Sequence, residues 1–178
     1  MAGTSATAES ATLAETVLHT PLGRDLYLAC DAEGVIASRF TARARRTAPA
    51  RRAVTRSASY AALSNAALRE AVRQIEAYFA RRLVRFELPL VLTGTPFQVA
   101  VWHAVAALRV GDLASYAEIA RAIGRPNAHR GVASALAQTP LALLIPAHRV
   151  VGADGTVRGA TPGSMRRRLL AFEGSRVR

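Results

Sequence analysis

The chain has 178 residues and a formal net charge of +12, and all 24 of its basic residues are arginine. Arginine binds phosphate bidentately and stacks on bases, so the charge favours a nucleic-acid partner, although a GC-rich genome also explains arginine in place of lysine. A single cysteine, Cys30, excludes an internal disulfide, and no Cys/His cluster has zinc-ligand spacing. No run reaches the roughly 18 apolar residues of a membrane helix. We therefore expect a cytoplasmic protein without metal, cofactor or membrane partner.

The first part of the chain predicts a small β-meander. Residues 1–11 are rich in Ala, Ser and Thr without an apolar period, which is typical of a disordered leader. Between Thr16 and Phe40, short apolar runs are broken by Gly23 and by the turn from Asp31 to Gly34, which indicates a hairpin or meander. The segment from Thr41 to Arg56 holds six arginines and no acid. It is expected to be a loop or edge segment with solvated charges.

An amphipathic helix is predicted between Ser64 and Leu83. Its apolar residues recur at helical spacing, and they are Leu68, Val72, Ile75, Phe79 and Leu83. The following segment, from Phe86 to Leu92, contains Pro89 and is expected to be a linker or edge strand. We place a domain boundary near Leu92, so that residues 12–92 form an N-terminal α/β domain and residues 93–178 form a second domain.

The second domain is predicted to be mainly helical. Thr95 and Pro96 supply an N-cap and a first-turn proline. Ser115 and Glu118 have the spacing of a capping box for a second, short helix, which Gly124 ends.

A third helix is expected to follow, with Asn127 as its cap. Two short helices joined by a tight turn make a helix-turn-helix candidate, although this geometry also occurs in purely structural corners. Residues 91–178 contain 11 arginines against four acids, and Arg130 falls in the first turn of the expected recognition helix. Because the start of such a helix reaches the DNA groove, the sequence predicts DNA binding.

Motifs along this second domain resemble those of the O6-alkylguanine-DNA alkyltransferases. In chain order the matching stretches are Thr95-Pro-Phe-Gln98, Val101-Trp102, Ser115-Tyr-Ala-Glu-Ile-Ala120, Arg130, Ile145-Pro146, His148-Arg-Val-Val151, Leu169-Leu170 and Glu173-Gly174. The resemblance implies an α+β fold: a ribonuclease H-like N-terminal β-meander plus helix, followed by a mainly helical, winged helix-turn-helix-like DNA-binding domain. It also implies chemistry in which a cysteine thiolate takes the alkyl group from a guanine flipped out of the duplex.

The same resemblance implies roles for individual residues. Arg130 would fill the gap left by the flipped base, Tyr116 would push on its phosphate, and His148 and Glu173 would form the relay that deprotonates the cysteine. The other residues expected at the DNA are Ser115, Arg125 and Ala128. Those expected around the lesion are Ala147, Pro146, Tyr116, Val150, Ala160 and Thr161. From the residues alone, a purely structural role stays open for His148 and for Tyr116.

The nucleophile position holds Ala147, which has no lone pair to accept an alkyl group. Two further departures from the family pattern are Thr139 in place of a hinge asparagine and Ala160 in place of a pocket tyrosine. Together they favour a monomeric, non-catalytic protein that binds O6-alkylguanine in double-stranded DNA, in a widened pocket, and hands the lesion to nucleotide excision repair. The alternatives are a methyltransferase whose nucleophile has been replaced by Ala147, and a helix-turn-helix regulator.

Overall fold

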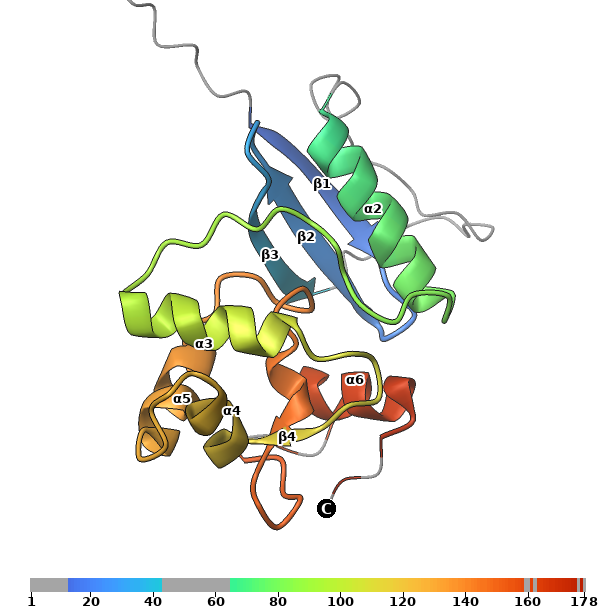
Figure 1. The fold of residues 1–178 in the computed structure, drawn as a ribbon. Coiled ribbons are helices and arrows are strands. Elements are labelled where there is room, and N and C mark those ends of the chain that lie inside the picture. Colours follow the sequence, from blue (N-terminus) through green and yellow to red (C-terminus); the bar gives the residue numbers. More distant parts are fainter. Residues whose placement is uncertain (1–12, 43–64, 159–160, 162, 176, 178) are drawn as a thin grey trace, which may run out of the picture.

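The computed structural model describes residues 13–42, 65–158, 161, 163–175 and 177. The predicted leader, and the arginine-rich segment from residue 43 onward, lie outside this part. The described chain forms a small sheet covered by one helix, followed by a mainly helical unit (Figure 1). The predicted α+β class is therefore confirmed. In the described residues, no helix is both long and apolar enough to cross a membrane, and no group of three His, Cys, Asp or Glu side chains is placed to hold a metal ion.

The N-terminal sheet is an antiparallel meander in the order β1-β2-β3. Its strands are β1 (Ala14–His19), β2 (Arg24–Cys30) and β3 (Val35–Ala42). Side chains along β1 alternate between buried and more exposed, because successive residues of a strand point to opposite faces. The turn before β3 is fixed by the Asp31 carboxylate, which accepts hydrogen bonds from the backbone of Glu33 and Gly34. The predicted meander is present.

Helix α2 (Ala66–Phe79) covers one face of this sheet (Figure 1). It begins after Asn65, whose side chain accepts a hydrogen bond from the N–H of Leu68 at 2.9 Å. The predicted end at Leu83 is wrong, because Arg81 adopts a left-handed conformation with φ 58° and turns the chain out of the helix. The buried aromatic of the last turn is Tyr78, not the predicted Phe79.

The segment that links the two units runs beside β3. The N–H of Val35 donates to the carbonyl of Pro89 at 2.9 Å, and the N–H of Val91 donates to the carbonyl of Val35 at 3.0 Å. This single bridge is all that the described structure contains of the predicted edge strand. Gly34 faces the Pro89 carbonyl so closely that a Cβ there would overlap it.

The C-terminal unit begins with three short helices that pack on one another (Figure 1). They are α3 (Pro96–Ala106), α4 (Tyr116–Ala122) and α5 (His129–Ala137). Thr95 caps α3 and a capping box at Ser115 starts α4, as the sequence predicts, and Thr95 also forms a capping box with Gln98.

The start of α5 differs from the prediction. The helix follows Ala128, and none of the described side chains caps it, so Asn127 is not its cap. Arg130 nevertheless lies in the first turn of α5.

The remaining elements surround the His-Arg motif, which lies in a single 3-10 turn. They are β4 (Ala114–Ser115), the 3-10 turn η1 (Ala147–Arg149), β5 (Val150–Val151) and α6 (Met165–Glu173). One apolar core runs through both units, from the sheet and α2 to α3, α5 and α6. In it the Trp102 indole is 2% exposed and donates to the carbonyl of Ala135 at 2.9 Å.

Candidate active site

Pairing of β4 with β5 brings two distant motifs together. The strands are parallel, with Ala114 opposite Val150 and Ser115 opposite Val151. Tyr116 follows β4 directly, and η1 precedes β5 directly. The pairing therefore places the first residue of α4 beside the turn that contains Ala147.

The N-terminal unit holds the chain just before that turn. Ser38 of β3 donates through its Oγ to the carbonyl of Ala142 at 2.7 Å, and its own carbonyl accepts from the N–H of Ala142 at 2.9 Å. Next along the chain, Leu143 is buried in a left-handed conformation with φ 75°. A non-glycine residue pays a conformational cost for such a φ, and the surrounding contacts must hold it there.

The predicted relay residues lie in contact. His148 Nε2 and Glu173 Oε1 are 2.9 Å apart, and both side chains are buried. Arg149 donates to the same carboxylate twice, through Nη2 to Oε1 at 2.7 Å and through Nε to Oε2 at 3.0 Å. Its Nη1 donates to the carbonyl of Leu108 at 2.7 Å. The arrangement is a bidentate buried ion pair with a histidine on one of its oxygens.

Burial and charge fix the protonation states of this cluster. Burial lowers the pKa of His148, and this outweighs the opposing effect of its hydrogen bond to Glu173. Burial alone would raise the pKa of Glu173, but the hydrogen bonds from His148 and Arg149 hold it at about 2. At neutral pH His148 is therefore neutral, with its Nε2–H donated to the carboxylate, and its other ring nitrogen is left able to accept a proton.

Sequence reasoning missed Arg166 of α6. Its Nη2 donates to the carbonyls of Ala147 at 3.0 Å and Val150 at 2.9 Å, and its Nη1 donates to the carbonyl of Arg158 at 2.8 Å. The same Nη2 lies 3.5 Å from the Tyr116 hydroxyl. Arg166 thus fixes the backbone around the nucleophile position. The only signal was the run of three arginines after Met165, and it does not say which of them turns inward.

Tyr78 was also missed. Its hydroxyl, carried by α2 in the N-terminal unit, donates to Glu173 Oε1 at 2.8 Å. The predicted relay is therefore larger than the pair His148 and Glu173, and it spans both units.

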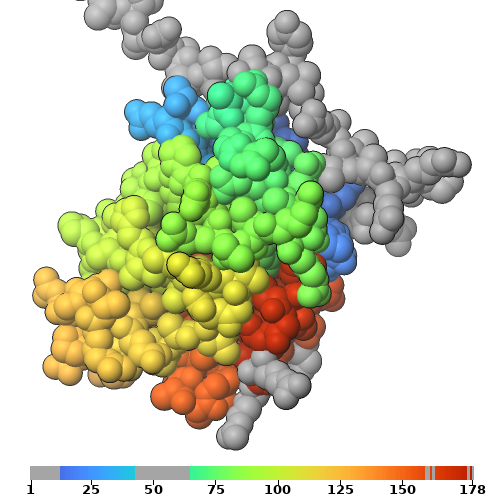
Figure 2. Space-filling view, turned by 45° about the vertical axis from the view of Figure 1, so that its right-hand side comes forward, coloured from blue at the N-terminus to red at the C-terminus, as the bar shows by residue number. Residues whose placement is uncertain are grey.

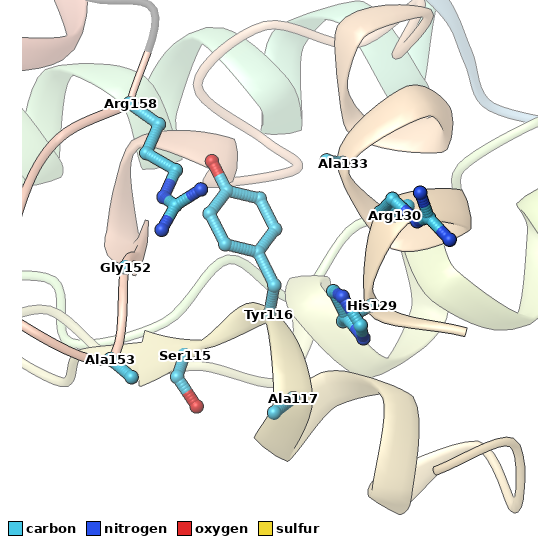
Figure 3. Close-up of a pocket in the computed structure, with 9 residues that line it drawn as sticks. All are labelled: Ser115, Tyr116, Ala117, His129, Arg130, Ala133, Gly152, Ala153 and Arg158. Atoms are coloured by element: carbon cyan, nitrogen blue, oxygen red, sulfur yellow. The ribbon is translucent and has the colours of Figure 1, made fainter. Parts of the chain in front are cut away.

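A pocket of about 260 Å³ opens between α4, the start of α5 and the loop after β5. Its lining residues are Ser115, Tyr116, Ala117, His129, Arg130, Ala133, Gly152, Ala153 and Arg158. Figure 3 shows the Tyr116 ring standing in this pocket with its hydroxyl towards Arg158, while the Arg130 side chain extends away from Tyr116. Arg130 is exposed, and none of the described residues hydrogen-bonds to its guanidinium. Three of the predicted DNA-contact residues, Ser115, Tyr116 and Arg130, thus meet at one cavity.

The other predicted DNA-contact residues lie nearby. Arg125 is exposed in the turn between α4 and α5, and Ala128 is the residue before α5.

The predicted lesion pocket only partly coincides with this cavity. Tyr116 lines it, but Ala147, Pro146 and Val150 do not. Pro146 and Val150 are buried, and Ala147 is half-buried with its carbonyl bonded to Arg166. These residues therefore belong to the buried part of the unit and do not line the cavity.

Three further predicted positions are Ala160 and Thr161 of the expected lesion pocket and Thr139, the expected hinge. Thr161 is exposed, and Ala160 lies outside the described residues. The hydroxyl of Thr139, the expected hinge, is buried and has no hydrogen-bond partner in the described structure. Thr139 therefore does not tie its two neighbouring segments together through its side chain.

Comparison with known proteins decides the family. Residues 13–92 match the family model for the "6-O-methylguanine DNA methyltransferase, ribonuclease-like domain", and residues 96–175 match that for the "6-O-methylguanine DNA methyltransferase, DNA binding domain". The methylated-DNA–protein-cysteine methyltransferase of Methanosarcina barkeri is 43% identical over 111 residues, which are 62% of this chain and 70% of that protein. The chain belongs to the 6-O-methylguanine DNA methyltransferase family.

Relatives from Mycobacterium tuberculosis agree. The methylated-DNA–protein-cysteine methyltransferase of that organism is 45% identical over 108 residues, which are 60% of this chain and 66% of that protein. The crystal structure of M. tuberculosis O6-methylguanine methyltransferase superposes with a TM-score of 0.71 at 32% identity, covering 93% of this chain and 95% of that one. An M. tuberculosis structure in complex with DNA gives 0.68 at 33% identity, covering 88% and 90%.

The predicted function, lesion recognition without transfer chemistry, is wrong for this member of the methyltransferase family. Relatives at 43–45% identity are named as cysteine methyltransferases, and the alternative, a methyltransferase with Ala147 at its nucleophile position, fits them better. The prediction gave most weight to Ala147, Thr139 and Ala160. It gave too little weight to His148 and Glu173, which in the structure form a buried cluster with Arg149.

Proposed function

We propose that the chain is an O6-methylguanine-DNA:protein-cysteine methyltransferase in the form in which Ala147 replaces the nucleophilic cysteine. The observation that carries the proposal is the buried contact between His148 and Glu173. His148 is the residue directly after position 147 in the chain. A neutral histidine oriented by a carboxylate is the arrangement that activates a neighbouring thiol. The names of the family relatives support the same reaction.

The chemistry requires a thiol at position 147. His148, neutral at its lowered pKa, takes the thiol proton, and the thiolate sulfur then attacks the methyl carbon. A sulfur–carbon bond forms, the bond between that carbon and O6 breaks, and its electron pair returns to the guanine. The guanine then takes up a proton at N1, which balances the proton that His148 received and later releases, and the base is restored. Alanine has neither a lone pair nor an ionisable proton. The proposed reaction therefore belongs to the Ala147→Cys form.

DNA recognition is assigned to the pocket side of the C-terminal unit. Arg130 and Arg158 are exposed and line the cavity, and Arg125 is exposed in the turn between α4 and α5. All three suit phosphate contacts. The M. tuberculosis structure determined with DNA supports a DNA partner for this fold. We assign base flipping to Arg130 and Tyr116, because an exposed arginine at the start of α5 and an aromatic ring in the same cavity suit an extruded base.

The test is the Ala147→Cys variant. It is incubated with duplex DNA containing O6-methylguanine, and the intact protein mass is followed. We expect a stoichiometric gain of one methyl group, complete in a single turnover. The unchanged chain and Ala147→Ser serve as controls, since a serine hydroxyl is a far weaker nucleophile than a thiolate.

The double variant Ala147→Cys with Glu173→Gln tests the relay within the same assay. It should transfer at least tenfold more slowly, because His148 loses the carboxylate that orients it. A folded Ala147→Cys protein that binds the duplex and never gains mass would contradict the proposed function.

A further inference from the structure

We propose that Tyr78 of the N-terminal unit is a positioning residue of the relay, so that the unit without the nucleophile controls how readily His148 accepts a proton. The proposal rests on the function proposed above and deepens it. Among the described residues, Tyr78 is the one side chain of the N-terminal unit that hydrogen-bonds to Glu173.

Glu173 Oε1 is the meeting point. This one oxygen accepts from Tyr78 Oη at 2.8 Å, from His148 Nε2 at 2.9 Å and from Arg149 Nη2 at 2.7 Å. All of these side chains are buried, so water does not compete for the oxygen. Donors that share one carboxylate oxygen also share its negative charge. The strength of the bond to His148 therefore depends on what Tyr78 contributes.

Packing alone does not account for the Tyr78 hydroxyl. The ring contacts Phe79, Phe86 and Phe172, with centroid distances of 5.0, 5.5 and 5.4 Å. A phenylalanine at position 78 would keep these contacts. Burial raises the pKa of the Tyr78 hydroxyl above its usual value, and the Glu173 charge raises it further. The Tyr78 hydroxyl therefore stays protonated and donates its hydrogen bond at physiological pH. This bond to Glu173 is the one interaction that a phenylalanine at position 78 would lose.

The contact between α2 and α6 makes the coupling mechanical as well as electrostatic. Arg81, just after α2, lies over the Phe172 ring at 4.9 Å. Figure 2 shows the surface of α2 and the segment after it adjoining the surface of α6. A shift of the N-terminal unit therefore moves the donor on Glu173.

Removing the hydroxyl has a predictable electrostatic effect. The groups that face His148 are the Glu173 carboxylate and the guanidinium groups of Arg149 and Arg166. Without Tyr78, Oε1 keeps more of its charge for His148, which stabilises the protonated imidazole. The pKa of His148 should rise, and a smaller fraction of His148 is then neutral on the acid side of its titration.

The first experiment uses the chain with Ala147 in place and needs no transfer. The His148 ring is titrated by NMR in the unchanged protein and in Tyr78→Phe. We expect a rise in the His148 pKa of about 0.5 or more, which corresponds to a roughly threefold change in the protonation equilibrium. Phe79→Leu is the matched control, since it alters the same aromatic cluster without touching Glu173. An unshifted titration in Tyr78→Phe, or an equal shift in Phe79→Leu, would overturn the proposal.

The second experiment measures single-turnover methyl transfer against pH in the Ala147→Cys background. Tyr78→Phe should move the acid limb of the rate profile to higher pH and slow transfer there about threefold, with DNA affinity unchanged. Phe79→Leu should leave the limb in place. A shifted His148 titration without any transfer in the Ala147→Cys protein contradicts the proposed function but not the coupling. If methyl transfer occurs and Tyr78→Phe leaves the acid limb of the rate profile unmoved, the proposed role of Tyr78 is wrong.

Discussion

Glu173 is the residue around which the site is built. Its carboxylate is fully buried and accepts hydrogen bonds from Tyr78, His148 and Arg149. An unpaired buried carboxylate would be strongly destabilising, whereas here the Arg149 fork neutralises it and the other donors satisfy its remaining lone pairs. The same bonds that make the charge tolerable also orient His148.

This cluster makes stability depend on pH in a defined direction. Burial lowers the pKa of His148 in the folded protein, so below about 6.5 the unfolded chain takes up a proton that the folded chain does not. Glu173 acts in the same direction between 4.5 and about 2. We therefore predict that the free energy of unfolding falls as the pH drops below about 6.5. Urea unfolding at about pH 7.5 and pH 5.5 measures it, and equal stability at both would contradict the buried neutral state of His148.

Sequence reasoning reached His148 and Glu173 only through the family resemblance, and it did not reach Tyr78. The apolar period chosen for α2 ran from Ile75 to Phe79, a step of four, whereas the helix buries Tyr78 after a step of three. Both steps fit one helical face. The partner of Tyr78 lies 95 residues away in the sequence, so no local pattern records the contact.

Among the elements, the turn between α4 and α5 depends on a single glycine. Gly124 has φ +70°, and the N–H of Arg125 closes the end of α4 by donating to the carbonyl of Ala120 at 2.8 Å. A Cβ at Gly124 would meet no atom within 4 Å, so the cost of Gly124→Ala is backbone strain alone, about 1 kcal/mol.

We predict that Gly124→Ala lowers the melting temperature by a few degrees and also weakens binding to lesion DNA, because the turn sets the direction of α5. Gly111→Ala is the control. Gly111 has φ +92° and equally open surroundings, but it lies between α3 and β4. It should show the thermal effect alone. Equal loss of DNA binding in the two variants would contradict a specific role for the α4–α5 turn.

Element starts were predictable where the signal is local. The capping boxes at Thr95 and Ser115 are complete within four residues, and both are present in the structure. The start of α5 was not predictable, because Ala128 gives no capping signal and the nearby Asn127 gives a false one. The end of α2 was not predictable either, because Arg81 takes up a left-handed conformation that no glycine marks, and the helix stops before Leu83.

At the scale of the whole molecule, charge sets the expected mode of DNA binding. The chain carries +12, and residues 91–178 hold 11 of its arginines. If about six phosphates are contacted, the logarithm of the association constant should fall with the logarithm of salt concentration at a slope near −5. A titration of fluorescent duplex at several salt concentrations measures this slope. A nearly flat dependence would contradict the DNA interface around Arg125 and Arg130.

Whole-molecule architecture was predictable, and the functional choice was not. The meander, the covering helix and the helical second unit follow from hydrophobic period and turn residues. Residue 147 alone, however, is compatible either with natural loss of transfer or with a replaced nucleophile. Only the integrity of the buried cluster and the identity of the relatives favour the second.

The most direct measurement is to locate the methyl group after Ala147→Cys has reacted with O6-methylguanine duplex DNA. The variant has one other thiol, Cys30, which is buried in β2 and whose pKa burial raises to about 11. Peptide mapping by mass spectrometry should find the methyl group on the peptide that contains position 147, and none on Cys30. A methyl group on Cys30, or on neither thiol after the lesion duplex has been bound, would contradict the assignment of position 147 as the acceptor.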